Sequence, residues 1–148
     1  MKIKDFRQVP NFPELEKEIL EFWDRDHTFQ KSIEQRSLDN SFSFYDGPPF
    51  ATGLPQYGHL MQSMIKDLIP RYQTMKGKRV RRVWGWDCHG LPVENIIEKE
   101  LNLDSKKDIE SYGVDKFNEA CRQTVLTYAE EWKKTIRRIG RWIDMDHA

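Results

Sequence analysis

The sequence predicts an α/β fold that corresponds to one half of a doubly wound parallel sheet, preceded by a helical arm. Three patterns support this prediction: an aromatic-rich strand pattern at 42–45, a long helical pattern after Pro55, and a second strand pattern at 80–86. Strand, crossover helix and strand make one βαβ unit with parallel strands. Since two strands and one crossover cannot bury themselves, we expect this unit to be part of a longer protein.

The helical arm is expected at the amino-terminal end. Asn11-Phe12-Pro13 is typical of a helix start, because proline suits the first turn. Apolar residues then recur at helical spacing as far as Trp23, and two later apolar residues let the helix continue or restart. The polar stretch 34–41 is the best internal boundary, which predicts an arm at 1–40 and the incomplete α/β region at 41–148.

The crossover helix is expected to pack on the sheet through a wide apolar face. Its apolar residues fall in pairs four apart, Leu60 and Met61, Met64 and Ile65, Leu68 and Ile69, and then Tyr72 and Met75. An internal proline loses a hydrogen bond and clashes with the preceding turn, so Pro70 predicts a kink or break near Ile69. Gly77 is a suitable stop.

Three more helices are expected after the second strand. Apolar spacing predicts a short amphipathic helix within 93–101, and Ser105 and Asp108 resemble a capping box for a second one. The most regular periodicity, with steps of three or four throughout 114–139, predicts one long helix that ends at Gly140.

Composition excludes several classes of protein. The 24 basic and 24 acidic residues balance, so no global field attracts nucleic acid. The two cysteines are too far apart for a disulfide framework or a zinc motif, and a reducing, cytoplasmic setting is expected. We expect no membrane partner, since no apolar run reaches membrane length and the first residues contain no signal core.

Polar clusters follow both predicted strands, at the edge where ligands of such units bind. The first cluster runs from Asp46 through a glycine-containing loop to Gly58 and His59, which open the helix. This strand–loop–helix geometry is typical of phosphate binding. Gly58 would let a flat ligand approach the backbone, and His59 could donate to phosphate oxygens. The alternative is that Gly58 only makes the turn and His59 is a solvated first-turn residue.

The second cluster contains Asp87, Cys88 and His89. A carboxylate at a strand end suits a ligand ammonium group, but Asp87 is equally suited to cap the next helix. Neighbouring residues point to opposite sides of a strand, so Cys88 and His89 are not expected to form a nucleophile–base pair, and no metal site is expected.

Two shorter patterns allow both a structural and a functional interpretation. The basic run at 76–82 could contact phosphate or RNA, but it is short, and a solvated helix end with a strand edge is favoured. Pro48-Pro49 locks the backbone, which either ends the strand or makes a rigid wall for a ligand.

Two sequence blocks carry a family resemblance. The first is DGPPFATGLPQYGHL at 46–60, with KDLIPRY after it, and the second is GWDCHGLPVE at 85–94. They resemble the class I aminoacyl-tRNA synthetases, with a HIGH-type signature at the end of the first block. Within that family the blocks are similar to the isoleucyl branch, because valyl and leucyl enzymes tend to carry other loops. The resemblance covers nearly the whole chain.

The resemblance implies the first half of a Rossmann-type (HUP-like) catalytic domain. The reaction it implies is activation of isoleucine with ATP to isoleucyl-adenylate, followed by transfer to tRNA(Ile), without a covalent enzyme intermediate. ATP, L-isoleucine and tRNA(Ile) are therefore the implied partners, with Mg²⁺ accompanying ATP. The sequence has no KMSKS-type loop and no editing, anticodon-binding or zinc module, so we expect the isolated chain to be inactive.

The family's functional positions can be carried onto this sequence one by one. Pro48 and Asp87 then contact isoleucine, with Asp87 holding the α-ammonium group. Two of the ATP-binding positions, Gln56 and His59, are also implied to be catalytic. The implied ATP-binding residues are Gly47, Gly53, Gln56, Gly58 and His59.

Gln56 departs from the family pattern, which normally has histidine there. Glutamine can donate one N–H to a phosphate but cannot become cationic, and the lost charge-assisted contact costs about 1–3 kcal/mol. The site could be a tolerated variant, a weakened enzyme or an inactive paralogue. The competing function is therefore a non-catalytic synthetase-like protein that binds a nucleotide, an amino acid or a partner.

Overall fold

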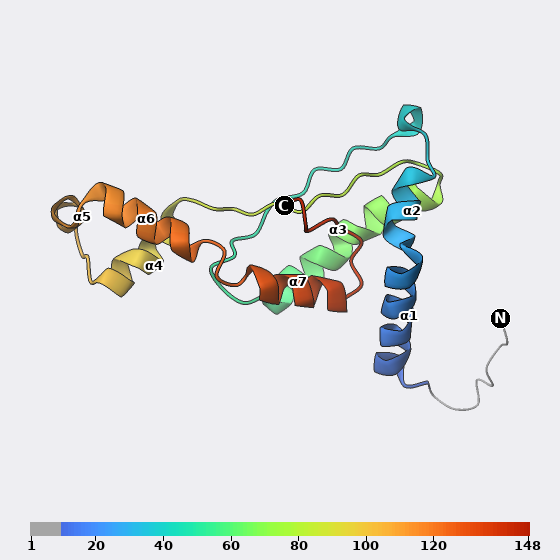
Figure 1. Cartoon of the computed structure of the whole chain (residues 1–148), viewed down its shortest axis with the longest axis horizontal. Coiled ribbons are helices and arrows are strands. Elements are labelled where there is room, and N and C mark those ends of the chain that lie inside the picture. Colours follow the sequence, from blue (N-terminus) through green and yellow to red (C-terminus); the bar gives the residue numbers. More distant parts are fainter. Residues whose placement is uncertain (1–9) are drawn as a thin grey trace.

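The computed structural model describes residues 10–148, so the first nine residues of the predicted arm lie outside the described part. The molecule is elongated, and two extended segments run alongside each other towards the lobe that contains α4, α5 and α6 (Figure 1). The helices are α1 (Phe12–Asp26), α2 (Thr28–Glu34), the short 3₁₀ helix η1 (Leu38–Asn40), α3 (Tyr57–Met75), α4 (Leu91–Leu101), α5 (Lys106–Tyr112), α6 (Val114–Thr124) and α7 (Ala129–Arg138).

The predicted parallel sheet, and with it the α/β fold class, is wrong for this structure. Within residues 10–148 the regular secondary structure consists of helices, and no strand is formed there. The segments expected as strands, 42–45 and 80–86, are extended backbone joined to their neighbours through isolated parallel bridges.

The register of the two extended segments explains why no ladder forms. One bridge joins Ser41 to Arg79 and another joins Phe50 to Asp87. The chain advances nine positions from Ser41 to Phe50 but eight from Arg79 to Asp87, so the segments slip by one residue and a continuous ladder is interrupted. Pro48-Pro49, just before the second bridge, also lacks the N–H groups that a ladder needs.

A third bridge brings in the carboxyl-terminal segment, between Val83 and Asp144. The Trp84 amide donates to the Asp144 carbonyl at 2.8 Å, and the Asp144 amide donates to the Arg82 carbonyl at 2.9 Å. The second extended segment is therefore held on one side by the first extended segment and on the other by the chain end.

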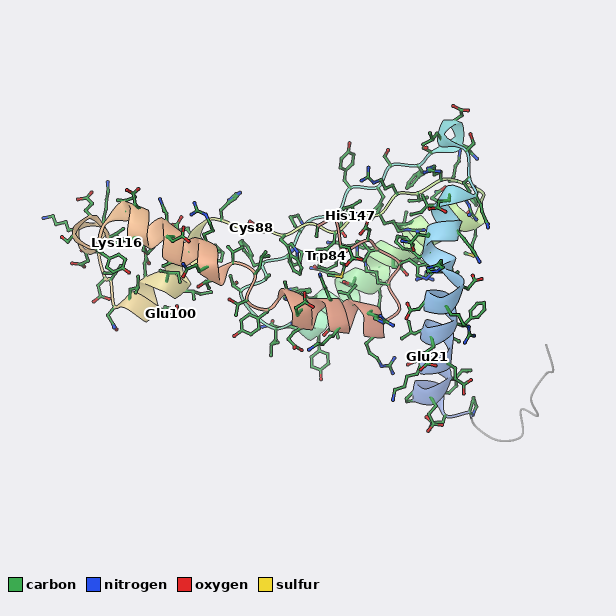
Figure 2. The ribbon with its side chains drawn as sticks, in the orientation of Figure 1. Glu21, Trp84, Cys88, Glu100, Lys116 and His147 are labelled. Carbon is green, nitrogen blue, oxygen red and sulfur yellow. The ribbon has the colours of Figure 1, made fainter. Side chains whose placement is uncertain are left out.

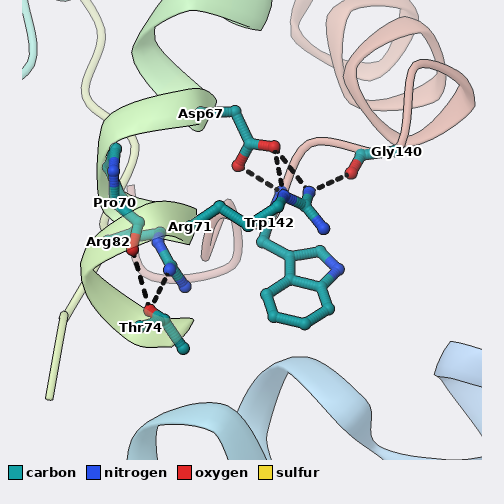
Figure 3. A network of polar contacts seen from close by, with 7 residues as sticks. All are labelled: Asp67, Pro70, Arg71, Thr74, Arg82, Gly140 and Trp142. Carbon is teal, nitrogen blue, oxygen red and sulfur yellow. Dashed lines mark hydrogen bonds and ion pairs between the residues drawn. The ribbon is translucent and has the colours of Figure 1, made fainter. Parts of the chain in front are cut away.

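Helix α3 continues through Pro70, so the expected break is not present. Contacts from other segments hold the helix on both sides of the proline. Arg71 donates to the Gly140 carbonyl at 2.8 Å, and Arg82 donates to the Thr74 hydroxyl (Figure 3). These contacts stabilise a helix that loses one backbone hydrogen bond at Pro70.

The expected stop at Gly77 is confirmed. Its φ of +83° lies in the left-handed region that glycine favours. The Gly77 amide donates to the Thr74 carbonyl and the Lys78 amide donates to the Gln73 carbonyl, both at 3.0 Å. This pair of hydrogen bonds is the Schellman motif.

The apolar face of α3 does not pack on a sheet as expected. Its buried residues are instead Ser63, Pro70 and Thr74. With no sheet to cover them, the large apolar side chains of α3 remain exposed, with Leu68 at 67% and Met75 at 75%.

The long helix expected at 114–139 is interrupted, giving α6 and α7 with a turn between them. The Tyr128 amide donates to the Ala51 carbonyl at 3.2 Å instead of continuing the helix. The Thr127 hydroxyl donates to the Thr124 carbonyl at 2.7 Å, a local bond that competes with helical pairing. A contact between distant segments therefore interrupts a helix that the regular spacing of apolar residues would otherwise predict as continuous.

The central apolar cluster consists of buried Trp84, Trp132 and Ile136, with partly buried side chains around it. Trp84 lies in the middle of the molecule, whereas Cys88 lies on the extended link towards α4 (Figure 2). None of the helices within residues 10–148 is long and apolar enough to cross a bilayer.

Two groups of helices flank this centre. The expected short helices are confirmed as α4 and α5, and the Ser105 hydroxyl caps α5 by accepting from the Asp108 amide at 3.3 Å. Helices α4 and α5 both contact α6. On the other side, Trp23 of α1 packs edge-on against Trp142 in the segment after α7, with 5.4 Å between ring centres.

Candidate active site

A cavity of about 430 Å³ opens between the first loop, the start of α3 and α7. This volume falls within the range of small-molecule sites. Five of the seven predicted site residues line it, namely Gly47, Pro48, Gly53, Gln56 and His59. Gly58 and Asp87 lie outside its lining.

Asp46 holds one wall of the cavity together. Its carboxylate forms ion pairs with Arg141 and, at 2.6 Å, with Lys66. Lys66 also donates to the Gly47 carbonyl at 3.0 Å, and Arg141 donates to the Ser63 hydroxyl at 3.2 Å. The Arg141 side chain is only 5% exposed, so these charges are paired inside the protein. The network connects the first loop, α3 and the carboxyl-terminal segment.

His59 is oriented by the first turn of α3. The Gln56 backbone amide donates to His59 Nδ1 at 3.0 Å. Because Nδ1 acts as the acceptor, the proton of the neutral imidazole is on Nε2. The half-buried ring lines the cavity, so Nε2–H is a donor suited to an anionic ligand there.

The indole of Trp132 contacts two of the predicted ATP-binding residues. Its Nε1–H donates to the Gly53 carbonyl at 2.8 Å. Its ring lies 4.9 Å from the His59 ring, measured between centres, at an interplanar angle of 52°. Trp132 is 1% exposed and lines the cavity from the α7 side.

The two residues expected to bind isoleucine lie near each other. The Asp87 amide donates to the Pro49 carbonyl at 2.9 Å, which places Asp87 beside the loop that carries Pro48. A Cβ atom added at Gly85 would lie 3.6 Å from the Pro48 ring, so Pro48 packs closely on this backbone. Gly90 and not Asp87 is the N-cap of α4, so the capping alternative for Asp87 is wrong.

Gly58 and Gln56 are both exposed at the start of α3. An added Cβ at Gly58 would meet no atom within 4 Å, so the turn itself does not require glycine by steric fit. Gln56 is the N-cap residue of α3, where it forms a capping box with His59, and it also lines the cavity.

The basic run at 76–82 has structural contacts, but it is only partly the solvated edge that was expected. Lys78 donates to the Asn40 side chain at 2.6 Å, and Arg79 donates to the Ile33 and Arg36 carbonyls, both at 3.1 Å. Arg82 is 5% exposed and lies next to Thr74 (Figure 3). Burial lowers the pKa of Arg82 to about 10, although the charge of Asp67 acts in the opposite direction.

Beside Arg82, Asp67 joins α3 to the carboxyl-terminal segment. It accepts from Arg71 Nε at 2.8 Å and from the Trp142 amide at 3.2 Å (Figure 3). The Arg71 guanidinium also lies 4.3 Å from the centre of the Trp142 ring. This network fixes the segment that carries Arg141 into the cavity wall.

Cys88 is exposed, and both cysteines are unpaired. Within residues 10–148, no group of three or more histidine, cysteine or acidic side chains is arranged to hold a metal ion.

The cavity-lining residues that sequence reasoning missed include Lys66, Trp132 and Arg141. Lys66 lies in a segment whose pattern indicates only a helix, Arg141 directly follows the expected helix stop at Gly140, and Trp132 is one member of an apolar period. The available signal was the accumulation of tryptophans at 84, 86 and 132, but one-dimensional spacing could not show that they meet.

The sequence is similar to that of known proteins over nearly its whole length. Residues 18–148 match the family model described as tRNA synthetases class I (I, L, M and V). The chain belongs to this family.

Individual relatives narrow the comparison. A protein from Treponema denticola named isoleucine–tRNA ligase is 59% identical over 137 residues. Proteins of the same name from Treponema pallidum and Bifidobacterium longum are 57% and 54% identical. These matches cover 93–94% of this chain but only 12–13% of the length of the relatives.

Proposed function

We propose that this chain forms the first part of the catalytic domain of an isoleucine–tRNA ligase. The observation that carries the proposal is the 54–59% identity to proteins of that name over nearly the whole chain. The proposed reaction activates L-isoleucine with ATP and then transfers it to tRNA(Ile). A cytoplasmic setting accompanies the proposal, in keeping with two unpaired cysteines.

In the first step, a carboxylate oxygen of isoleucine attacks the α-phosphorus of ATP, and the bond from that phosphorus to pyrophosphate breaks. His59 Nε2–H would donate to a phosphate oxygen, and Gln56 would add a neutral donor. Gly47, Gly53 and Gly58 would let the nucleotide approach the backbone. No side chain bonds covalently to the substrate, so the protein contributes positioning and charge stabilisation.

Isoleucine would bind on the side of the loop that Pro48 and Asp87 share. The Asp87 carboxylate would pair with the α-ammonium group, and the rigid Pro48 ring would limit where the amino acid lies. The backbone bond from Asp87 to Pro49 supports this assignment because it holds the two residues together before the ligand arrives.

Mg²⁺ would enter with the ATP phosphates. The described residues present no cluster of acidic ligands, so the oxygens of ATP would supply most of the coordination. The chemistry that the ion supplies is neutralisation of phosphate charge.

The alternative function is a non-catalytic synthetase-like protein that binds a nucleotide, an amino acid or a partner. Gln56 favours it, because the cavity then has one cation fewer next to the phosphates. The two functions differ in one measurable property, the isoleucine-dependent exchange of pyrophosphate into ATP.

The test uses a chimaera in which this chain replaces the matching region of the Treponema denticola relative. We expect the chimaera to exchange pyrophosphate with isoleucine, and His59→Ala to lower the rate by about a hundredfold. Valine should serve less well, but one methylene supplies only about 1–3 kcal/mol of discrimination. The isolated chain should show no exchange or a trace. Absence of exchange from a folded chimaera would favour the non-catalytic alternative.

A further inference from the structure

Trp132 connects the interior of the molecule to both parts of the predicted nucleotide site. Its side chain is 1% exposed and belongs to the same cluster as Trp84 and Ile136. A buried indole N–H usually has a hydrogen-bond partner, so what matters here is which segment supplies the partner. The Trp84 Nε1 atom, in the same cluster, has none among the described residues. The Trp132 Nε1–H instead reaches out of the cluster to the Gly53 carbonyl at 2.8 Å.

The loop around Gly53 is attached to α7 at two points. The indole of Trp132 holds Gly53, and the Tyr128 amide holds the Ala51 carbonyl at 3.2 Å. Both donors come from the first turn of α7 or its N-cap. The position of the loop is therefore set by α7, although α7 begins more than seventy residues further along the sequence.

The ring of Trp132 supports His59 from the interior side. The ring centres are 4.9 Å apart, a normal separation for packed aromatic rings. On its other side, His59 Nδ1 accepts the Gln56 amide. With Nδ1 occupied and one ring face covered, the imidazole is limited to an orientation in which Nε2–H remains free for a ligand.

We propose that Trp132 is a positioning residue for the phosphate end of the site. It fixes the Gly53 loop through its N–H, and its ring holds His59 in the orientation in which Nδ1 accepts from the Gln56 amide. The effect of Trp132 on catalysis rests on the proposed function. The effect of Trp132 on His59 does not rest on that function, because the tautomer of His59 can be measured in the chain by itself.

Three variants separate the two contacts from simple loss of packing. Trp132→Phe retains an aromatic ring beside His59 but removes the N–H, and Trp132→Leu removes both. Ile136→Ala is the matched control, since Ile136 is also 1% exposed, lies four residues further along α7 and belongs to the same cluster. It should destabilise the chain without contact to the loop.

The first measurement is nitrogen NMR of the four histidines in the 148-residue chain. We expect His59 in the unsubstituted chain and in Trp132→Phe to be the Nε2–H tautomer at neutral pH. Trp132→Leu should give a mixture of tautomers, and Ile136→Ala should leave His59 unchanged. A His59 spectrum that responds equally to Trp132→Leu and Ile136→Ala would overturn the proposal.

The second measurement is pyrophosphate exchange by the chimaera. Trp132→Phe should raise the KM for ATP about fivefold to tenfold while the KM for isoleucine stays within about twofold. Trp132→Leu should in addition lower kcat by about tenfold or more. Equal changes of both KM values, or values like those of Ile136→Ala, would contradict the positioning role. An inactive unsubstituted chimaera would count against the proposed function alone, and the NMR result would still decide this inference.

Discussion

Gln56 is the residue at which the sequence departs from the HIGH-type signature that it resembles. The His59 imidazole accepts from the backbone amide of Gln56, so the Gln56 side chain can be changed without removing that hydrogen bond. Gln56→His should add a group able to carry positive charge next to the phosphates. We expect it to raise pyrophosphate exchange by the chimaera about tenfold, since about 1.4 kcal/mol in the barrier corresponds to that factor.

The matched control for this prediction is Gln56→Ala, which keeps the backbone bond but removes both donors. It should lower the rate or leave it unchanged, and loss of the side-chain half of the capping box should lower the free energy of unfolding by about 1 kcal/mol. If Gln56→His and the unsubstituted chimaera exchange at the same rate, glutamine is sufficient for the reaction.

Asp46 is the residue on which the wall of the cavity depends. Asp46→Asn would leave Arg141, whose side chain is 5% exposed, without its ionic partner. Breaking a largely buried pair in this way should lower the free energy of unfolding by about 3 kcal/mol. Urea unfolding of the chain measures the change.

Asp24→Asn is a suitable comparison for Asp46→Asn. The Asp24–Arg137 ion pair also joins distant segments, but its side chains are 54% and 66% exposed. Exposed pairs contribute less than about 1 kcal/mol, so this variant should unfold close to the unsubstituted chain. Equal losses from both substitutions would mean that burial of the Asp46 pair does not determine its strength.

At the scale of single elements, α3 carries Gly58 and His59 in its first turn and ends just before Gly77. Its stop at Gly77 relies on a φ of +83°, and an added Cβ there would meet no neighbour within 4 Å. Gly77→Ala should therefore destabilise the chain through backbone conformation alone, by about 1–2 kcal/mol. Thermal unfolding followed by circular dichroism would report the loss.

Gly58→Ala in the same helix is the control that distinguishes the effect of a positive φ from the effect of steric crowding. An added Cβ at Gly58 also meets nothing within 4 Å, but its φ is not in the left-handed region. The free energy of unfolding of the Gly58→Ala variant should be unchanged or raised by as much as about 1 kcal/mol. Similar losses from both glycine variants would contradict the role of the positive φ at Gly77.

The elements also show what sequence patterns can predict. Helix ends were predictable where local chemistry decides them, as at Ser105 and Gly77, because caps and left-handed glycines act within a few residues. The interruption of 114–139 was not predictable, since it depends on the bond from Tyr128 to Ala51. The exposure of the apolar face of α3 was likewise missed because it depends on a sheet that does not form.

At the scale of the whole molecule, the acidic groups predict how stability depends on pH. Hydrogen bonds from Lys31 and Thr28 lower the pKa of Asp26 below its ordinary value of 3.8. Burial opposes ionisation of Asp144, but hydrogen bonds from the His147 side chain and from the Asp146 and His147 amides outweigh it and lower its pKa.

A carboxyl group whose pKa is lowered by folding stabilises the folded chain above its ordinary pKa, and this contribution is lost as the pH falls through the lowered value. We therefore expect the free energy of unfolding to change little between about pH 7 and 5 and to fall below about pH 4. Urea unfolding at each pH measures it. Asp144→Asn should make the fall shallower, and an equally steep fall in that variant would exclude Asp144 as a cause.

The site was predictable to a larger extent than the architecture. Short motifs name their own residues, and five of those named line one cavity. The register of the extended segments could not be read from strand patterns, because a one-residue slip between 41–50 and 79–87 leaves each pattern unchanged. The same limit hid Trp132 and Arg141, which reach the cavity from the far end of the sequence.

The central claim is that this chain supplies the carboxylate for the isoleucine ammonium group at one end of the site and the phosphate donors at the other. The most direct test is the KM for isoleucine of the chimaera with Asp87→Asn, which removes the charge but retains the backbone bond to Pro49. We expect this KM to rise by about tenfold or more while the KM for ATP stays within about twofold. An unchanged KM for isoleucine would contradict the claim.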